Sequence, residues 1–249
     1  MVKKKKKIKL LVAQPTPSNL NSPFYDLEKK HNIKITFQTF LLIEGETVKN
    51  IRLKKLHIPS YTAIILTSRN AVNHYFRICD EMRINVPNSL KYFCISEAVS
   101  YYLQKYIAYR KRKIYSANNN FDELVELMNK HENDRFMLVT SNFIKDEIIT
   151  KLDSSGINYT RAPLFKTVSS DLSKTKLASF DIIGLYSPRD VESIYSNFPD
   201  FQQDDIKIAA FGEATQKKAI DHGLKLAIQA PSKEHPSMSM AIDAYLHSL

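Results

Sequence analysis

The chain contains the same passage twice, about 119 residues apart, and this repeat strongly limits the folds that it can adopt. Residues 61–72 read YTAIILTSRNAV and residues 180–191 read FDIIGLYSPRDV, with the apolar run and a serine in register. A second pair follows at nearly the same offset, YFCISEAV at residues 92–99 and IAAFGEAT at residues 208–215. Two such pairs predict two similar domains, each built from strand–loop–helix units.

The apolar periodicity predicts the same alternation of strands and helices along most of the chain. In the middle, strands are expected at residues 63–67, 92–95, 113–115 and 135–140, and helices at residues 71–82, 97–108, 121–131 and 144–154. The later half repeats this order, with strands at residues 182–186, 207–211 and 225–228 and a helix at residues 237–247. This alternation predicts an α/β fold, in which a parallel sheet is covered by helices on both faces.

The C-terminal half ends before a counterpart of the strand at residues 135–140. An isolated apolar segment, residues 8–13, is the candidate that completes its sheet, and a helix is expected near residues 23–31. Two β-rich segments, residues 34–43 and 159–168, are expected to pair as a two-strand β-ladder linker. The expected domains are therefore a discontinuous α/β domain of residues 1–35 and 169–249, an inserted α/β domain of residues 44–159, and linker strands at residues 36–43 and 160–168.

Charge and composition exclude several classes of protein. The net charge is +10, but the lysines at positions 3–7 and 9 contribute six of these charges, and we interpret that run as a solvated tail. A second basic cluster, residues 110–113, comes with no recognised nucleic-acid motif, so no nucleic-acid partner is expected. No apolar stretch reaches the roughly 20 residues of a membrane span. The chain is expected to be cytoplasmic and monomeric, with Cys79 and Cys94 as buried, reduced thiols.

No cofactor or metal is expected from the motifs. The seven histidines show no HxH or HExxH spacing, and no Cys/His cluster accompanies them. There is no GxGxxG or Walker loop and no GxSxG elbow. An α/β protein without these signatures is either a cofactor-free enzyme or a binding protein.

The ordered blocks TSRNAV, SEAV, YSPRDV, FGEATQKKAIDHGL and APSKEHPSMSMAIDAYL resemble the uroporphyrinogen-III synthase family over residues 8–246. The resemblance implies two flavodoxin-like domains joined by a β-ladder. It implies a cofactor-free enzyme that closes hydroxymethylbilane, a linear tetrapyrrole with eight carboxylates, into uroporphyrinogen III. The resemblance also implies that ring D is inverted through a spiro intermediate, and the reaction is expected to occur in the cleft between the domains.

Candidate substrate-binding residues follow from the loops at the carboxyl ends of the expected strands, where α/β proteins bind ligands. Hydroxyls and backbone N–H groups at helix N-termini suit carboxylates. These loops carry Thr67, Ser68, Asn70, Ser96, Thr140, Ser141, Asn142, Ser187, Gly212 and Ser237. The side chains of Arg69, Lys145 and Arg189 could pair with substrate carboxylates. Taken alone, each of Ser68, Ser96, Asn142, Ser187 and Ser237 is interpreted as a plain helix N-cap rather than a ligand contact, whereas their common placement on one rim favours binding for the set.

Two catalytic positions come from the resemblance. Thr215 falls where the family's GPxT-like loop has its threonine, although Glu213 replaces the proline of that loop. Phe165 occupies the position of a family tyrosine that is thought to assist departure of the hydroxyl, and a phenyl ring cannot donate a hydrogen bond. These two departures leave an alternative open: a non-catalytic relative that binds a tetrapyrrole or another polyanion.

Overall fold

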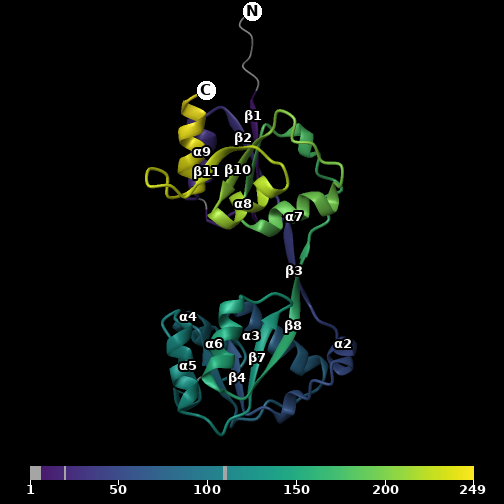
Figure 1. Ribbon diagram of the computed structural model, residues 1–249, viewed down its shortest axis with the longest axis vertical. Coiled ribbons are helices and arrows are strands. Elements are labelled where there is room, and N and C mark those ends of the chain that lie inside the picture. The colour runs from purple at the N-terminus through teal and green to yellow at the C-terminus, as the bar shows by residue number, and fades with distance from the viewer. Residues whose placement is uncertain (1–6, 20, 109–110) are drawn as a thin grey trace, which may run out of the picture. The chain divides into compact units, whose positions relative to one another are not determined.

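Two largely parallel β-sheets organise the chain, one in each of two compact units (Figure 1). The computed structural model describes residues 7–19, 21–108 and 111–249. The terminal unit consists of the described residues of Met1–Leu42 together with Val168–Leu249, and the middle unit consists of those of Ile43–Thr167. The chain passes between the units within two strands, β3 (Leu41–Gly45) and β8 (Tyr159–Ser169).

The middle unit contains a six-stranded sheet in the order β3-β8-β7-β4-β5-β6. Besides β3 and β8, its strands are β4 (Ala63–Leu66), β5 (Lys91–Cys94), β6 (Ile114–Ser116) and β7 (Phe136–Ser141). Strand β4 pairs in parallel with β5 and β7. Because successive strand residues face opposite sides of a sheet, Ile64 and Leu66 enter one core cluster and Ala63 and Ile65 enter the other.

Helices cover both faces of this sheet. On the face of Ile64 and Leu66 lie α2 (Val48–Leu53), α3 (Arg69–Glu81) and α4 (Glu97–Tyr102). On the other face lie α5 (Phe121–Asn129) and α6 (Asp146–Ser155). The buried residues of α3 recur at helical spacing, so they lie on one face of the helix, and this face packs against the sheet. They are Ala71, Val72, Tyr75, Ile78 and Cys79. The short 3-10 helices of this unit are η1 (Ile58–Ser60), η2 (Leu103–Lys105) and η3 (Lys111–Lys113).

The terminal unit contains a five-stranded parallel sheet in the order β11-β10-β9-β1-β2. Its strands are β1 (Ile8–Val12), β2 (Ile33–Phe37), β9 (Ile182–Leu185), β10 (Lys207–Phe211) and β11 (Leu226–Ala230). Helices α1 (Pro23–Lys30) and α9 (Met238–His247) cover one face. Helices α7 (Pro188–Asn197) and α8 (Glu213–Asp221), together with η4 (Leu177–Ser179), cover the other.

Strand β1 lies between β9 and β2, so a segment from the start of the chain joins strands from its last third. Leu10 is in register with Ile35 of β2 and with Ile182 of β9. The order β11-β10-β9-β1-β2 then matches β6-β5-β4-β7-β8 of the middle unit, strand for strand. Both units are thus α/β layers on parallel sheets, as the repeat predicts.

The segment at residues 34–43 differs from the single extended linker strand expected from the sequence. It divides into β2, which belongs to the five-stranded sheet, and β3, which lies beside β8. Between these strands Phe40 is 1% exposed and packs into the core of the terminal unit, and its carbonyl accepts the Ser170 N–H at 2.8 Å. The burial of this ring interrupts the extended run. Residues 160–167 likewise belong to the middle unit as part of β8.

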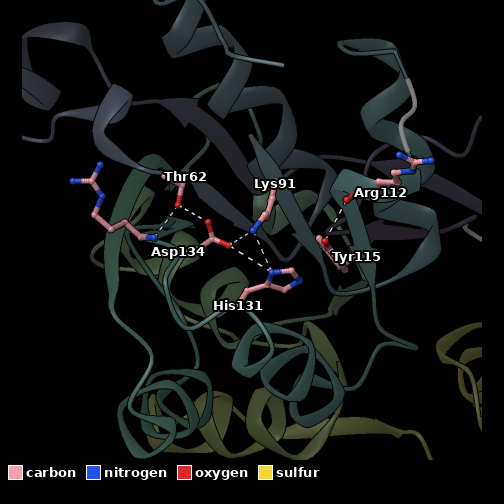
Figure 2. A network of polar contacts seen from close by, with 7 residues as sticks. Thr62, Lys91, Arg112, Tyr115, His131 and Asp134 are labelled. Carbon is pink, nitrogen blue, oxygen red and sulfur yellow. Dashed lines mark hydrogen bonds and ion pairs between the residues drawn. The ribbon is translucent and has the colours of Figure 1, made fainter. Parts of the chain in front are cut away.

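A network of polar contacts lies at the edge of the middle-unit sheet where the strands start, and it links residues at the beginnings of neighbouring strands (Figure 2). The Asp134 carboxylate lies 2.5 Å from Lys91 Nζ and accepts the Thr62 hydroxyl at 2.8 Å. Lys91 Nζ also lies 3.2 Å from Nδ1 of His131. These residues precede β4, begin β5 and precede β7, so the network joins strand starts at the edge opposite the carboxyl-end loops.

In the described part of the chain, no helix combines the length and the apolar character needed to cross a bilayer. Of the basic segments noted in the sequence, lysines 3–6 and Arg110 lie outside the described residues.

Candidate functional site

A cavity of about 550 Å³ opens at the carboxyl ends of the middle-unit strands. The loops after β4 and β7, the start of α5, the first turns of α6 and one residue of β8 contribute to its wall. The residues that line it are Thr67, Ser68, Ile95, Asn119, Asn120, Phe121, Thr140, Ser141, Phe143, Ile144, Lys145, Glu147, Ile148, Lys151 and Phe165. Hydroxyl, amide, ammonium and carboxylate groups therefore share this cavity with apolar side chains.

Ser68 caps α3 at the cavity wall. Its Oγ accepts the backbone N–H of Ala71 at 3.1 Å, which satisfies one of the unpaired donors of the first turn. A hydroxyl that accepts one hydrogen bond can still donate one. Ser68 can therefore cap the helix and donate to a ligand oxygen at the same time, so its two interpretations are compatible.

Two lysines and one glutamate, Lys145, Lys151 and Glu147, are the charged residues that line the cavity. Lys145 lies at the N-cap position of α6, is exposed, and forms no ion pair recorded among the described residues. Lys151 is held by two carboxylates, Asp122 and Glu147, each at 2.9 Å, and hydrogen bonding to them raises the pKa of Lys151. Lys145 is accordingly the more available of the two cations for an anionic ligand.

Phe165 borders the same cavity from β8. Its side chain is only 7% exposed, and its ring stacks on the imidazole of His74 with centroids 4.9 Å apart. Burial lowers the pKa of His74, and the nearby Arg77 guanidinium lowers it further. Arg77 donates to His74 Nδ1 at 3.2 Å and to the carbonyl of Glu46 at 2.7 Å. The ring of Phe165 is thus held in place by its contact with His74 of α3, which Arg77 of the same helix positions in turn.

Four other predicted residues of the middle unit lie outside the lining of the cavity: Arg69, Asn70, Ser96 and Asn142. Asn142 instead fastens the loop after β7 to β8, because its Oδ1 accepts the Thr167 N–H and its own N–H donates to the carbonyl of Phe165, both at 3.0 Å. Ser96 is 7% exposed, and its side chain makes no capping hydrogen bond to α4. Asn70 lies in the first turn of α3.

In the terminal unit, Ser187 is the N-cap of α7 and forms a reciprocal capping box with Asp190. Its Oγ accepts the Asp190 N–H at 3.3 Å, while Asp190 Oδ2 accepts the N–H groups of Tyr186 and Ser187, each at 2.8 Å. Asp190 is 3% exposed, and this burial raises the pKa of its carboxyl group although the hydrogen bonds oppose the shift. Arg189, in the same first turn, has its pKa lowered by burial.

The other three predicted residues of the terminal unit follow β10 and β11. Gly212 has φ +84°, a conformation that side chains with a Cβ rarely adopt, and its N–H donates to the carbonyl of Ala230 at 2.6 Å. Thr215 is 2% exposed, so very little of its side chain is accessible to a ligand. Ser237 caps α9 by accepting the Met240 N–H at 3.2 Å.

Sequence patterns missed two groups of residues. The loop before α5 was not among the expected binding loops, although its polar run, residues 118–120, could have indicated it. The second group is His31, Asp243 and His247 of the terminal unit, whose ligand atoms all lie within 4.8 Å of one another. Because these residues come from distant parts of the chain, no local spacing could reveal the cluster.

Comparison with known proteins gives a consistent result. A family model described as "Uroporphyrinogen-III synthase HemD" matches residues 34–240. Among solved structures, uroporphyrinogen-III synthetase from Helicobacter pylori is similar at a TM-score of 0.58 with 15% identity, covering 97% of this chain and 100% of that one. A mutant uroporphyrinogen III synthase from Thermus thermophilus is similar at a TM-score of 0.54 with 11% identity and the same coverage. No curated protein matches the chain. At these identities the solved structures support the fold, while the family model carries the assignment.

Proposed function

The chain belongs to the uroporphyrinogen-III synthase family, enzymes of tetrapyrrole biosynthesis, and we propose that it converts hydroxymethylbilane to uroporphyrinogen III with inversion of ring D. The observation that carries this proposal is the family match together with a cavity at the carboxyl ends of the strands. That cavity combines hydroxyl donors, a helix N-terminus and an available lysine. Such an arrangement suits a substrate that presents many carboxylates.

The substrate supplies most of the chemical driving force. Loss of the hydroxyl as water leaves a cationic azafulvene, stabilised by the pyrrole nitrogen. The substituted carbon of ring D attacks this cation to form a spiro intermediate. Reopening and reclosure then give the inverted ring, and loss of a proton restores aromaticity. The protein's main task in this scheme is to hold a flexible chain in the folded conformation from which the correct carbon attacks.

Phe165 limits which protein groups can assist the first step. It borders the cavity, but its ring has no proton to give to the departing hydroxyl. We therefore assign that departure to the electronic push of the pyrrole, with the Ser68 hydroxyl and the Lys145 ammonium as donors that stabilise developing negative charge on oxygen. Thr215 of the terminal unit contributes less directly in this proposal, because it is almost fully buried.

Substrate carboxylates are proposed to contact the Lys145 ammonium and the first-turn N–H groups of α3, while the single donor of Ser68 serves the departing hydroxyl. The cavity of about 550 Å³ accommodates part of a linear tetrapyrrole. The loops of Ser187, Arg189, Gly212 and Ser237 in the terminal unit remain candidates for the other carboxylates. Binding between the two domains, as expected from the sequence, stays a prediction.

The activity is tested with freshly prepared hydroxymethylbilane, which closes spontaneously to isomer I without ring inversion. We expect the purified chain, with no metal or nucleotide added, to give isomer III after oxidation and chromatographic separation. Lys145→Met should raise the KM several-fold, whereas Lys130→Met, an exposed lysine of the same unit that does not line the cavity, should leave it unchanged. Product identical to the protein-free control would refute the enzymatic proposal. Retained tetrapyrrole binding in that case would support the non-catalytic alternative raised by Phe165 and Glu213.

A further inference from the structure

Two imidazoles and one carboxylate converge on the surface of the terminal unit. His31 Nε2 lies 2.6 Å from Asp243 Oδ1, and His247 Nε2 lies 3.6 Å from the same oxygen. The exposed fractions of the three side chains are 13% for His31, 28% for Asp243 and 58% for His247. The three ligand atoms are therefore close together, on side chains that are each at least partly exposed to solvent.

The backbone that carries these residues is fixed by packing. His31 follows the last residue of α1, and its N–H donates to the carbonyl of Leu27 at 2.9 Å. Asp243 and His247 lie four residues apart on α9, a spacing that places side chains on the same helical face. Leu27 of α1 and Leu246 of α9 belong to one buried core cluster, so the two helices hold the three side chains near one another without help from a ligand.

The two carboxylate oxygens of Asp243 have different partners, and this leaves Oδ1 for a metal ion. Lys30 Nζ lies 2.7 Å from Oδ2, whereas both imidazoles face Oδ1. Metal-bound carboxylates are commonly hydrogen-bonded in this way on the side away from the ion, which fixes their orientation. In a tetrahedral zinc site with bond lengths of about 2.0–2.1 Å, neighbouring ligand atoms are roughly 3.3 Å apart. To reach that value, the distance between His31 Nε2 and Asp243 Oδ1 must increase from 2.6 Å, whereas the distance between His247 Nε2 and Asp243 Oδ1, 3.6 Å, is already close to it.

We propose that His31, Asp243 and His247 form a binding site for Zn²⁺. Two imidazole nitrogens and one carboxylate oxygen are a ligand set that favours zinc and related transition metals, whereas Mg²⁺ and Ca²⁺ prefer oxygen ligands throughout. Three protein ligands leave the fourth tetrahedral position to water. Among the described residues, no other group of histidine, cysteine and acidic side chains meets in this way.

The site lies away from the chemistry proposed for the carboxyl-end loops. Helix α9 begins after Ser237 at that edge of the sheet, and His247 is its last residue. At about 1.5 Å per residue, ten residues of helix separate the two ends by roughly 15 Å. The ion would therefore join the end of α9 to the end of α1 and stabilise the terminal unit, and this inference does not depend on the proposed activity.

The test is calorimetric titration of the full chain with ZnCl₂. We expect one equivalent to bind with a dissociation constant of about 1–10 μM, since the ligands are partly exposed and Lys30 adds a positive charge. His247→Ala should weaken binding at least tenfold, and Asp243→Asn should do the same. The matched control is His57→Ala, because His57 is a histidine of the middle unit that lies outside the cluster; its titration should equal that of the wild type.

Thermal unfolding gives a second readout. One equivalent of bound Zn²⁺ should raise the melting temperature of the wild type and of His57→Ala but not that of His247→Ala. His247 is more than half exposed, so its replacement should leave the circular dichroism spectrum unchanged. Absence of saturable binding below about 100 μM, equal affinity in His247→Ala and wild type, or equally tight binding of MgCl₂ would each overturn the proposal.

Discussion

Removing the Asp134 carboxylate should destabilise the middle unit more than removing a carboxylate from an exposed ion pair would. Asp134 is 12% exposed and Lys91 is 25% exposed, so this pair is intermediate between a surface pair and a buried one. Asp134→Ala leaves the Lys91 ammonium without its carboxylate and the Thr62 hydroxyl without its acceptor. Exposed pairs contribute about 0–1 kcal/mol, whereas breaking a buried pair costs about 3–5 kcal/mol. Because Lys91 keeps some access to water, we expect a loss of about 2–3 kcal/mol.

Urea and thermal unfolding measure this loss. The chain has no tryptophan, so far-UV circular dichroism is the suitable probe. A loss of this size corresponds to a decrease of about 6–12 °C in the melting temperature of a unit of this length. Asp134→Asn should fall between Ala and wild type, because the amide oxygen can still accept from Thr62. The matched control is Asp122→Ala in the same unit, whose side chain is 62% exposed and which should cost less than about 1 kcal/mol. If Asp134→Ala costs no more than Asp122→Ala, the network in Figure 2 does not contribute as argued.

Three further predictions concern the candidate site and its surroundings. Phe165→Tyr should preserve or raise turnover of hydroxymethylbilane, because it adds a hydroxyl at the cavity wall; a loss greater than tenfold would contradict the proposed position of this ring. Ser68→Ala should reduce the free energy of unfolding by about 1 kcal/mol, because α3 loses its cap. It should reduce kcat/KM only modestly, because binding is distributed over many donors. An unchanged free energy of unfolding in urea would refute the capping role. Burial lowers the folded-state pKa of His74 below 6.5, so the unfolded chain takes up a proton first as the pH falls. Stability should therefore decrease below pH 6.5, and urea unfolding of His74→Gln should show a weaker pH dependence than the wild type.

Periodicity predicts the buried strands well because their environment dictates their composition. The strand expected at residues 63–67 corresponds to β4, whose four residues are all fully buried and hence all apolar. The helix expected at residues 97–108 is shorter, since α4 ends at Tyr102 and continues as η2. Residues 34–43 look uniformly β-rich, and only the tertiary burial of Phe40 shows where β2 ends and β3 begins.

The candidate site was less predictable than the fold. Thr67, Ser68, Thr140, Ser141 and Phe165 do gather around one cavity, because they follow or lie on neighbouring parallel strands. The sequence does not show which hydroxyls are already engaged in the structure, nor that Asn142 fastens a loop to β8. Both depend on side-chain partners that are far apart in the chain or set by loop geometry. The cluster of His31, Asp243 and His247 depends on the packing of α1 against α9, which no motif records.

The position of β1 inside the terminal sheet, between β9 and β2, has a consequence for how the chain is made. Leu10, Leu11 and Val12 are at most 1% exposed in the finished molecule, yet one neighbouring strand, β9, begins about 170 residues later. At about 5–20 residues per second, the ribosome needs roughly 9–34 s to supply it. The middle unit is synthesised completely within that interval and can fold first. Throughout this time β1 exposes an apolar strand edge on the nascent chain. We therefore expect β1 to be the segment that pairs prematurely with other strands or is bound by a chaperone.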